Sequence, residues 1–111
     1  MAAYVSFLVG KGEAATFFGT HQKTEKDSSP KDITGYTILV TAKHPDGTVA
    51  FAVPGAVLVG NAGTYSWSVT SVQTNIAHDT LDIDIWRTDA GNEELMALGK
   101  FVIGQNVKYG S

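Results

Sequence analysis

The feature that most constrains the fold of this chain is an alternation of apolar and polar residues with a period of two. In residues 80–87, apolar side chains occupy every second position at Leu81, Ile83 and Ile85. Residues 64–69 repeat the pattern, and Gly-, Pro- and Asn-containing turns interrupt it about every ten residues. Such alternation is typical of strands that bury one face and expose the other. The sequence therefore predicts an all-β domain.

Seven or eight short strands are expected between these turns. They are predicted at residues 4–9, 14–22, 35–43, 48–53, 57–59, 64–69, 80–87 and 94–103. Pro54 and Gly55 are expected to end one strand, and Gly19 indicates a bulge or a close backbone approach. Residues 71–78 are ambiguous, because the spacing of Val72 and Ile76 allows one helical turn. Many short strands with regular turns predict an antiparallel sandwich or a small barrel.

The domain organisation is expected to be simple. A chain of 111 residues corresponds to a single domain, residues 1–111, by ordinary domain sizes. Residues 1–9 are apolar on both faces and are interpreted as a central strand, or as an arm that adds to a neighbour's sheet. Residues 23–32 lack apolar side chains and are expected to form an exposed loop. Residues 105–111 are interpreted as a peripheral tail.

Composition excludes several function classes. Charged residues make up 17% of the chain, below the roughly 25% typical of soluble domains, which favours a neutral surface suited to assembly. The net charge is −3 and the basic residues are scattered, so nucleic-acid binding is not expected. The chain has no cysteine, which excludes disulfides and thiolate metal sites. No signal peptide or apolar run of about 20 residues is found, so a soluble protein with no membrane partner is expected.

No catalytic, cofactor or metal site is predicted. His21, His44 and His78 lie in different segments, and each is expected to have an ordinary surface role. His78 precedes Asp79, but the sequence offers no Cys and no Gly-x-Ser-x-Gly serine for an acid–base pair to activate. The chain is therefore not expected to be an enzyme.

The densest acidic group consists of Asp79, Asp82 and Asp84. Asp82 and Asp84 share one strand face, so their oxygens are candidates for binding a calcium ion. The competing interpretation is a solvated outer face whose charges block pairing at a sheet edge. The second interpretation is favoured because no calcium-binding loop spacing is present.

Trp86 is the most informative residue for a binding function. Alternation places it on the polar face with Asp82 and Asp84, where it is either an interface anchor or is packed beneath a loop. Trp67, in contrast, is expected in the core. The candidate interface residues are Tyr4, Phe7, Val9, Trp86 and Tyr109.

The order of the short motifs resembles a known family. Residues 32–37 (Asp-Ile-Thr-Gly-Tyr-Thr) lead into a strand, and an Asp-Gly turn follows at residues 45–47. A Gly-Thr-Tyr strand, the strand at residues 80–86 and an Asp-x-Gly hairpin come next. This series resembles the immunoglobulin-like domains of tailed-phage virion proteins, such as the N-terminal domain of baseplate upper proteins and small tail proteins. It implies an immunoglobulin-like antiparallel β-sandwich over roughly residues 10–104.

The resemblance implies a non-enzymatic structural protein of a tailed-phage virion. Such a protein is made in the host cytoplasm, and as a tail, baseplate or adaptor component it contacts other virion proteins and copies of itself in a symmetric assembly. The expected contact elements are residues 2–9, 23–32 and 105–111 and the face around Trp86. Two alternatives remain open: a capsid decoration protein, and a carbohydrate- or cell-surface-binding module on the same fold.

Overall fold

The chain is almost entirely β-structure, as expected. The computed structural model describes residues 3–23, 29–77 and 79–104. Its strands are β1 (Ala3–Gly10), β2 (Ala15–Thr20), β3 (Ile38–Lys43), β4 (Val49–Val59), β5 (Thr64–Val69), β6 (Asp79–Arg87) and β7 (Glu94–Gly104). A short 3-10 turn, η1 (Gly60–Ala62), and one helical turn, α1 (Ser71–Thr74), complete the described elements. The predicted all-β class is confirmed.

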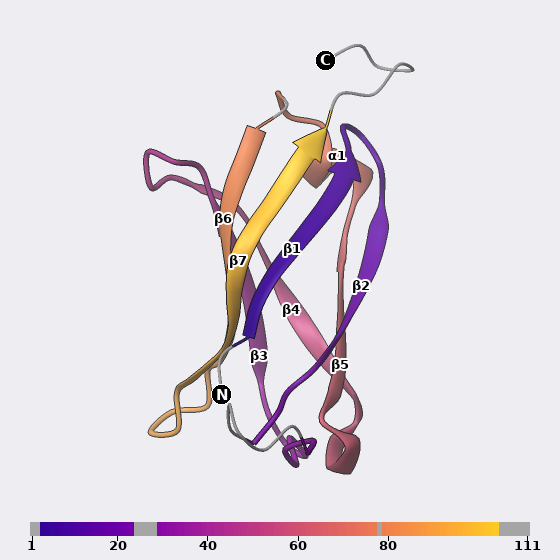
Figure 1. The fold of residues 1–111 in the computed structure, drawn as a ribbon. Coiled ribbons are helices and arrows are strands. Elements are labelled where there is room, and N and C mark those ends of the chain that lie inside the picture. Colours follow the sequence, from indigo (N-terminus) through magenta and orange to yellow (C-terminus); the bar gives the residue numbers. More distant parts are fainter. Residues whose placement is uncertain (1–2, 24–28, 78, 105–111) are drawn as a thin grey trace.

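The strands form two layers that share one strand. The order is β1-β7-β6-β3-β4-β5-β2 (Figure 1). Val49–Gly55 of β4 pairs with β3, whereas Ala56–Val59 pairs with β5. We call β1, β7, β6, β3 and the first half of β4 sheet A, and the second half of β4 with β5 and β2 sheet B. Placing β3, β6 and β7 in one layer and β2, β5 and the end of β4 in the other is the arrangement of an immunoglobulin-type sandwich.

One predicted strand end is wrong. Pro54 and Gly55 do not stop the strand at 48–53, because β4 continues through them to Val59. Pairing with β5 starts only at Ala56, so one side of β4 has no ladder partner at Pro54, where a missing N–H is tolerated. A Cβ on Gly55 would lie 2.7 Å from Ile38 Cγ2, so glycine permits the close approach of β3 and β4.

The position of β1 also corrects the predictions. β1 is not a central strand; it lies at the edge of sheet A and pairs with β7 in parallel, from Ala3 opposite Ala97 to Gly10 opposite Gly104. The sandwich is therefore not wholly antiparallel. A Cβ on Gly99 would overlap the carbonyl group of Val5, so this seam requires glycine in β7.

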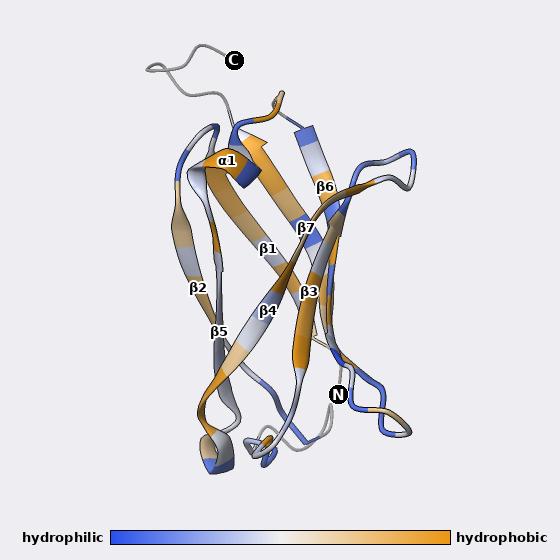
Figure 2. Cartoon of the chain, turned by 180° about the vertical axis from the view of Figure 1, so that it is seen from behind, coloured by the Kyte–Doolittle hydropathy of each residue, from blue (hydrophilic) through white to orange (hydrophobic). Residues whose placement is uncertain are grey.

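The core lies between the two sheets, on the sides that the alternation predicted. The alternating residues Tyr65, Trp67, Val69, Leu81, Ile83 and Ile85 are buried, and so are Ile38, Val40 and Ala42 of β3. At its centre is an aromatic layer of Phe7, Phe17, Trp67 and Phe101. The ring centroids of Phe17 and Trp67 are 4.6 Å apart, and those of Phe7 and Trp67 are 5.1 Å apart. Figure 2 shows hydrophobic residues along the strands and hydrophilic residues in the turns at the ends of the sandwich.

The turn predicted at residues 44–47 is confirmed, and the ambiguous segment after residue 70 begins with one helical turn. In the turn at residues 44–47, the His44 N–H donates to the Thr48 carbonyl over 2.8 Å, and Gly47 has a φ of 91°. In α1, the Thr70 hydroxyl accepts from the Gln73 N–H, and the Gln73 side chain accepts from the Thr70 N–H. This capping box explains why a helical turn forms in an otherwise extended chain.

Candidate functional site

The best candidate site is the outer face of sheet A. Successive side chains of a strand point to opposite faces of a sheet. In β1, β7, β6 and β3, the side chains that alternate with the core residues therefore lie together on this face. We define this outer face by Tyr4, Leu39, Thr41, Lys43, Asp82, Asp84, Trp86, Leu98 and Lys100. It includes the acidic positions and the tryptophan that the sequence singled out on one face of residues 80–87.

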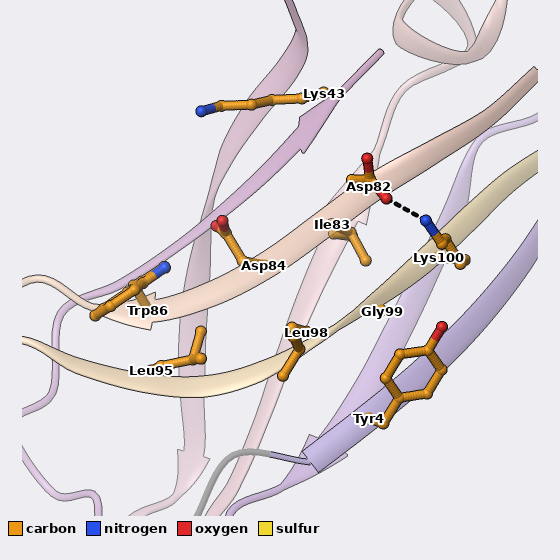
Figure 3. Close-up of a pocket in the computed structure, with 10 residues that line it drawn as sticks. All are labelled: Tyr4, Lys43, Asp82, Ile83, Asp84, Trp86, Leu95, Leu98, Gly99 and Lys100. Carbon is orange, nitrogen blue, oxygen red and sulfur yellow. Dashed lines mark hydrogen bonds and ion pairs between the residues drawn. The ribbon is translucent and has the colours of Figure 1, made fainter. Parts of the chain in front are cut away.

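The centre of this face is apolar and open. Trp86 is 39% exposed, Leu98 41% and Tyr4 71%. Tyr4 of β1 stands directly opposite Leu98 of β7, and Trp86 of β6 stands opposite Leu39 of β3. Trp86, Leu98 and Tyr4 border a shallow depression of about 480 Å³ (Figure 3). An exposed tryptophan, tyrosine and leucine on one rigid sheet form the kind of surface that anchors partners.

Charged side chains surround the apolar centre. Lys100 Nζ forms an ion pair with Asp82 Oδ1, the contact dashed in Figure 3. This hydrogen bond and the carboxylate charge raise the pKa of Lys100. Within the described residues, Lys43 and Asp84 on the same face have no ion-pair partner. The face therefore offers charges of both signs to a partner.

The structure brings together only part of the predicted interface set. Tyr4 and Trp86 share the outer face of sheet A, where the alternation of residues 80–87 had placed Trp86. Phe7 and Val9 instead point into the sandwich: the Phe7 ring belongs to the aromatic layer, and Val9 is 4% exposed. Because β1 is held in sheet A, these two side chains are core residues rather than contact residues. Tyr109 lies outside the described residues.

The acidic residues do not assemble a metal site in this structure. Asp82 is paired with Lys100, and the Asp79 carboxylate lies 3.5 Å from His44 Nδ1. Across the part of the chain that the structure describes, no group of three His, Asp or Glu side chains is arranged to hold a metal ion. The calcium interpretation of these aspartates therefore has no geometric support.

A second cluster surrounds the carboxylate of Glu94, and the sequence did not predict it. His21 was expected at the surface, but it is only 2% exposed, so that expectation is wrong. His21 Nε2 lies 3.1 Å and Lys31 Nζ 2.7 Å from Glu94 Oε2. The Tyr36 hydroxyl donates to Glu94 Oε1 over 2.9 Å. These groups come from the end of β2, the segment before β3 and the start of β7, which are far apart in sequence.

The pKa shifts of this cluster indicate a structural role, in which an ionised Glu94 is held by hydrogen bonds. Burial of the Glu94 carboxylate opposes its ionisation, but hydrogen bonds from Lys31, His21 and Tyr36 outweigh it and lower the Glu94 pKa to about 2. Burial lowers the pKa of His21, which keeps this imidazole neutral near pH 7, and Nε2 then donates to the carboxylate. Three donors from distant segments hold the carboxylate, so the cluster fastens these segments to one another. His21 Nδ1 is buried and has no hydrogen-bond partner within the described residues.

The outer face of sheet B offers a weaker candidate. Phe18 is 69% and Leu58 52% exposed, and they border a depression of about 410 Å³. Small residues surround them: Ser66 is opposite Phe18, and the Thr16 hydroxyl bonds to that of Ser68 over 2.9 Å. Among the described residues of this face there is no charged rim and no tryptophan, so the face offers fewer features that a specific partner could recognise.

Comparison with models of known protein families and with curated proteins found no match to this chain. The class of this protein is therefore defined by its own structure. It is an all-β sandwich whose sheet A exposes aromatic side chains on its outer face. Among residues 3–23, 29–77 and 79–104, no helix has the length and apolar character that a membrane crossing requires.

Proposed function

We propose that this chain is a non-enzymatic structural component of a tailed-phage virion that binds neighbouring proteins through the outer face of sheet A. The observation that carries the proposal is Trp86, which is left exposed beside Leu98 and Tyr4 on a rigid sheet. An isolated monomer gains nothing from exposing these side chains. Tryptophan and tyrosine are instead enriched among the residues that dominate binding energy.

The setting of these side chains supports protein contacts. The apolar centre supplies area to bury, and the rim at Lys43, Asp82 and Lys100 supplies charges that fix orientation. The sequence motifs that resemble phage immunoglobulin-like domains favour a virion, in which many weak contacts add up across a symmetric assembly. Tail, baseplate and adaptor positions are all compatible with such a face, as is a capsid decoration role.

Incorporation into particles tests the proposal. The protein should be found by mass spectrometry in purified virions, and Trp86→Ala should reduce its copy number at least about tenfold if Trp86 is a hot spot. Phe18→Ala, on the outer face of sheet B, is the matched control and should leave incorporation unchanged. Absence of the wild-type protein from particles would contradict the proposal.

Glycan binding is the second candidate, because Trp86 and Tyr4 flank the same depression as the carboxylate of Asp84. Aromatic rings that face a carboxylate suit stacking and hydrogen bonding to a sugar. A glycan array would show binding that Trp86→Ala abolishes and Phe18→Ala preserves. Binding of that kind, without incorporation into particles, would favour this function over the first.

A further inference from the structure

The free edge of β1 is the most informative surface that the outer face of sheet A does not explain. Within residues 3–23, 29–77 and 79–104, β1 pairs only with β7, and the strand order places it at the end of the sheet (Figure 1). Its segment Ala3–Gly10 contains no charged residue and no proline. Natural proteins usually protect a long edge strand with such residues or with a bulge, because an open edge pairs with other chains.

Two hydrogen bonds at the end of β1 show which backbone groups face the open edge. The Lys11 N–H donates to the Gly104 carbonyl at the end of β7, so odd-numbered residues of this segment bond toward β7. The Gly10 N–H instead donates to the Glu13 side chain over 2.6 Å, away from β7. Because the backbone groups of a strand alternate sides, the N–H and C=O groups of Tyr4, Ser6 and Leu8 face the open edge.

The side chains at these positions are exposed in a symmetric pattern. Tyr4 and Leu8 are each 71% exposed, and Ser6 lies midway between them and is also exposed. All three point to the outer face of sheet A, whereas Val5, Phe7 and Val9 point toward the core. Two large apolar side chains therefore flank a small polar residue on an open strand edge.

We propose that β1 pairs with β1 of a second copy in antiparallel orientation, about a twofold axis through Ser6. In this register Ser6 faces the partner's Ser6, and Tyr4 faces the partner's Leu8. Each of these pairs exchanges backbone hydrogen bonds, because the groups that face the edge belong to these residues. Tyr4 then packs against the partner's Leu8 on one face, where cross-strand aromatic–aliphatic pairs are stabilising.

Several features favour a second copy as the occupant of this edge. A twofold axis matches the edge to itself, and the absence of charge between Ala3 and Gly10 removes like-charge repulsion across the axis. The joined sheets also make the outer faces of sheet A continuous across the dimer. The β2 edge is less suited, because it is shorter and carries Gly19 in its interior. The inference deepens the proposed function by naming one contact between copies.

Ser6→Pro tests the pairing directly. Proline at this position removes an N–H that faces the open edge and leaves the hydrogen bonds of β1 to β7 in place. Sedimentation velocity over a dilution series should show a monomer–dimer equilibrium for the wild type. Ser6→Pro should raise the dimer Kd at least about tenfold, since two backbone hydrogen bonds across the axis are lost. Ser6→Ala keeps the N–H and is the matched control, with an unchanged Kd.

A cross-link provides a second readout that does not depend on how the proline variant folds. The chain has no cysteine, so Ser6→Cys introduces a single thiol at the twofold axis. Paired residues of this type have Cα atoms about 5.5 Å apart, within the range of a disulfide. Mild oxidation should convert Ser6→Cys to a covalent dimer, whereas Ser68→Cys, exposed on sheet B, should form no covalent dimer although its β1 edge still pairs.

The outcomes separate this inference from the proposed function. A wild-type monomer at every concentration, a dimer that tolerates Ser6→Pro, or equal cross-linking of the two cysteine variants would overturn the pairing of β1. Absence of the protein from virions, with a β1 dimer in solution, would overturn the proposed function alone. A particle component that stays monomeric in solution and forms no cross-link at Ser6 would overturn this inference alone.

Discussion

The two tryptophans of this chain lie in contrasting regions: the aromatic layer between the sheets and the outer face of sheet A. Trp67 is 2% exposed and packs against Phe7 and Phe17, whereas Trp86 is 39% exposed. Both lie on strands in which apolar and polar residues alternate. Trp67 occupies a position that faces the core, and Trp86 occupies one that faces outward. The same residue type therefore contributes to folding in one region and is available for binding in the other.

The largest expected effect is the loss of the buried ring. Trp67→Ala should lower the free energy of unfolding by about 3 to 5 kcal/mol, because it empties the centre of the aromatic layer. Urea denaturation measures the change. Trp67→Phe keeps a ring and removes an indole N–H that has no hydrogen-bond partner within the described residues, so it should cost about 1 to 2 kcal/mol. Equal losses for the two variants would show that ring packing is not what Trp67 contributes.

The second-largest effect is expected at the parallel pairing of β1 with β7. Gly99→Ala should cost about 2 to 3 kcal/mol, because the added methyl group overlaps the Val5 carbonyl and forces β1 away from β7. Gly104→Ala is the control on the same strand, since its nearest contact would be Leu8 Cδ1 at an ordinary 3.4 Å. Thermal melts of both variants measure the difference. A Gly99→Ala protein as stable as Gly104→Ala would contradict the parallel pairing.

A smaller effect is expected at Glu94, whose partly exposed carboxylate binds His21, Lys31 and Tyr36. Glu94→Gln should lower the free energy of unfolding at pH 7 by about 1 to 2 kcal/mol, because the ionic hydrogen bonds from Lys31 and His21 are weakened. Chemical denaturation of the variant and the wild type at pH 7 measures the loss. An unchanged stability would mean that the cluster does not fasten its three segments.

The same cluster predicts the direction of pH dependence. The Glu94 pKa falls from an ordinary 4.5 to about 2 in the folded chain, so its stabilisation is complete above pH 4.5 and disappears as the pH falls to about 2. The lowered pKa of His21 acts in the same direction, because the unfolded chain takes up that proton first as the pH falls below 6.5. Denaturation at a series of pH values should show a shallower loss below pH 4.5 for Glu94→Gln than for the wild type.

The smallest effect on stability is expected at the exposed tryptophan. Trp86→Ala should lower the free energy of unfolding by about 1 kcal/mol, because Trp86 lies on the outer face with 39% of its surface exposed, and its removal leaves no enclosed cavity between the sheets. Urea denaturation beside Trp67→Ala makes the contrast quantitative. A loss as large as that of Trp67→Ala would place Trp86 in the core and remove the basis of the proposed contact face.

Local alternation predicted much of the fold and part of the candidate site. The inward positions Leu81, Ile83 and Ile85 and the outward position of Trp86 follow from parity within one strand. The turn at residues 44–47 follows from the preferences of proline and glycine. Side-chain direction within a strand and turn formation depend on residues that are close in the sequence, so both can be predicted from the sequence alone.

The features that were missed depend on contacts between distant segments. His21 and Glu94 are separated by 73 residues, and nothing near either residue indicates that they meet. The inward direction of Phe7 and Val9 follows from the pairing of β1 with β7, because an apolar run alone does not show which side is buried. The passage of β4 through Pro54 depends on where β5 begins to pair.

The sharing of β4 between the sheets also has a consequence for how the molecule comes apart. Neither sheet can unfold by itself and leave the other intact. Separating sheet B from sheet A breaks backbone hydrogen bonds of β4, which belongs to both sheets. Amide protons in the first and second halves of β4 should therefore exchange through a common global opening rather than through separate openings of two independent sheets.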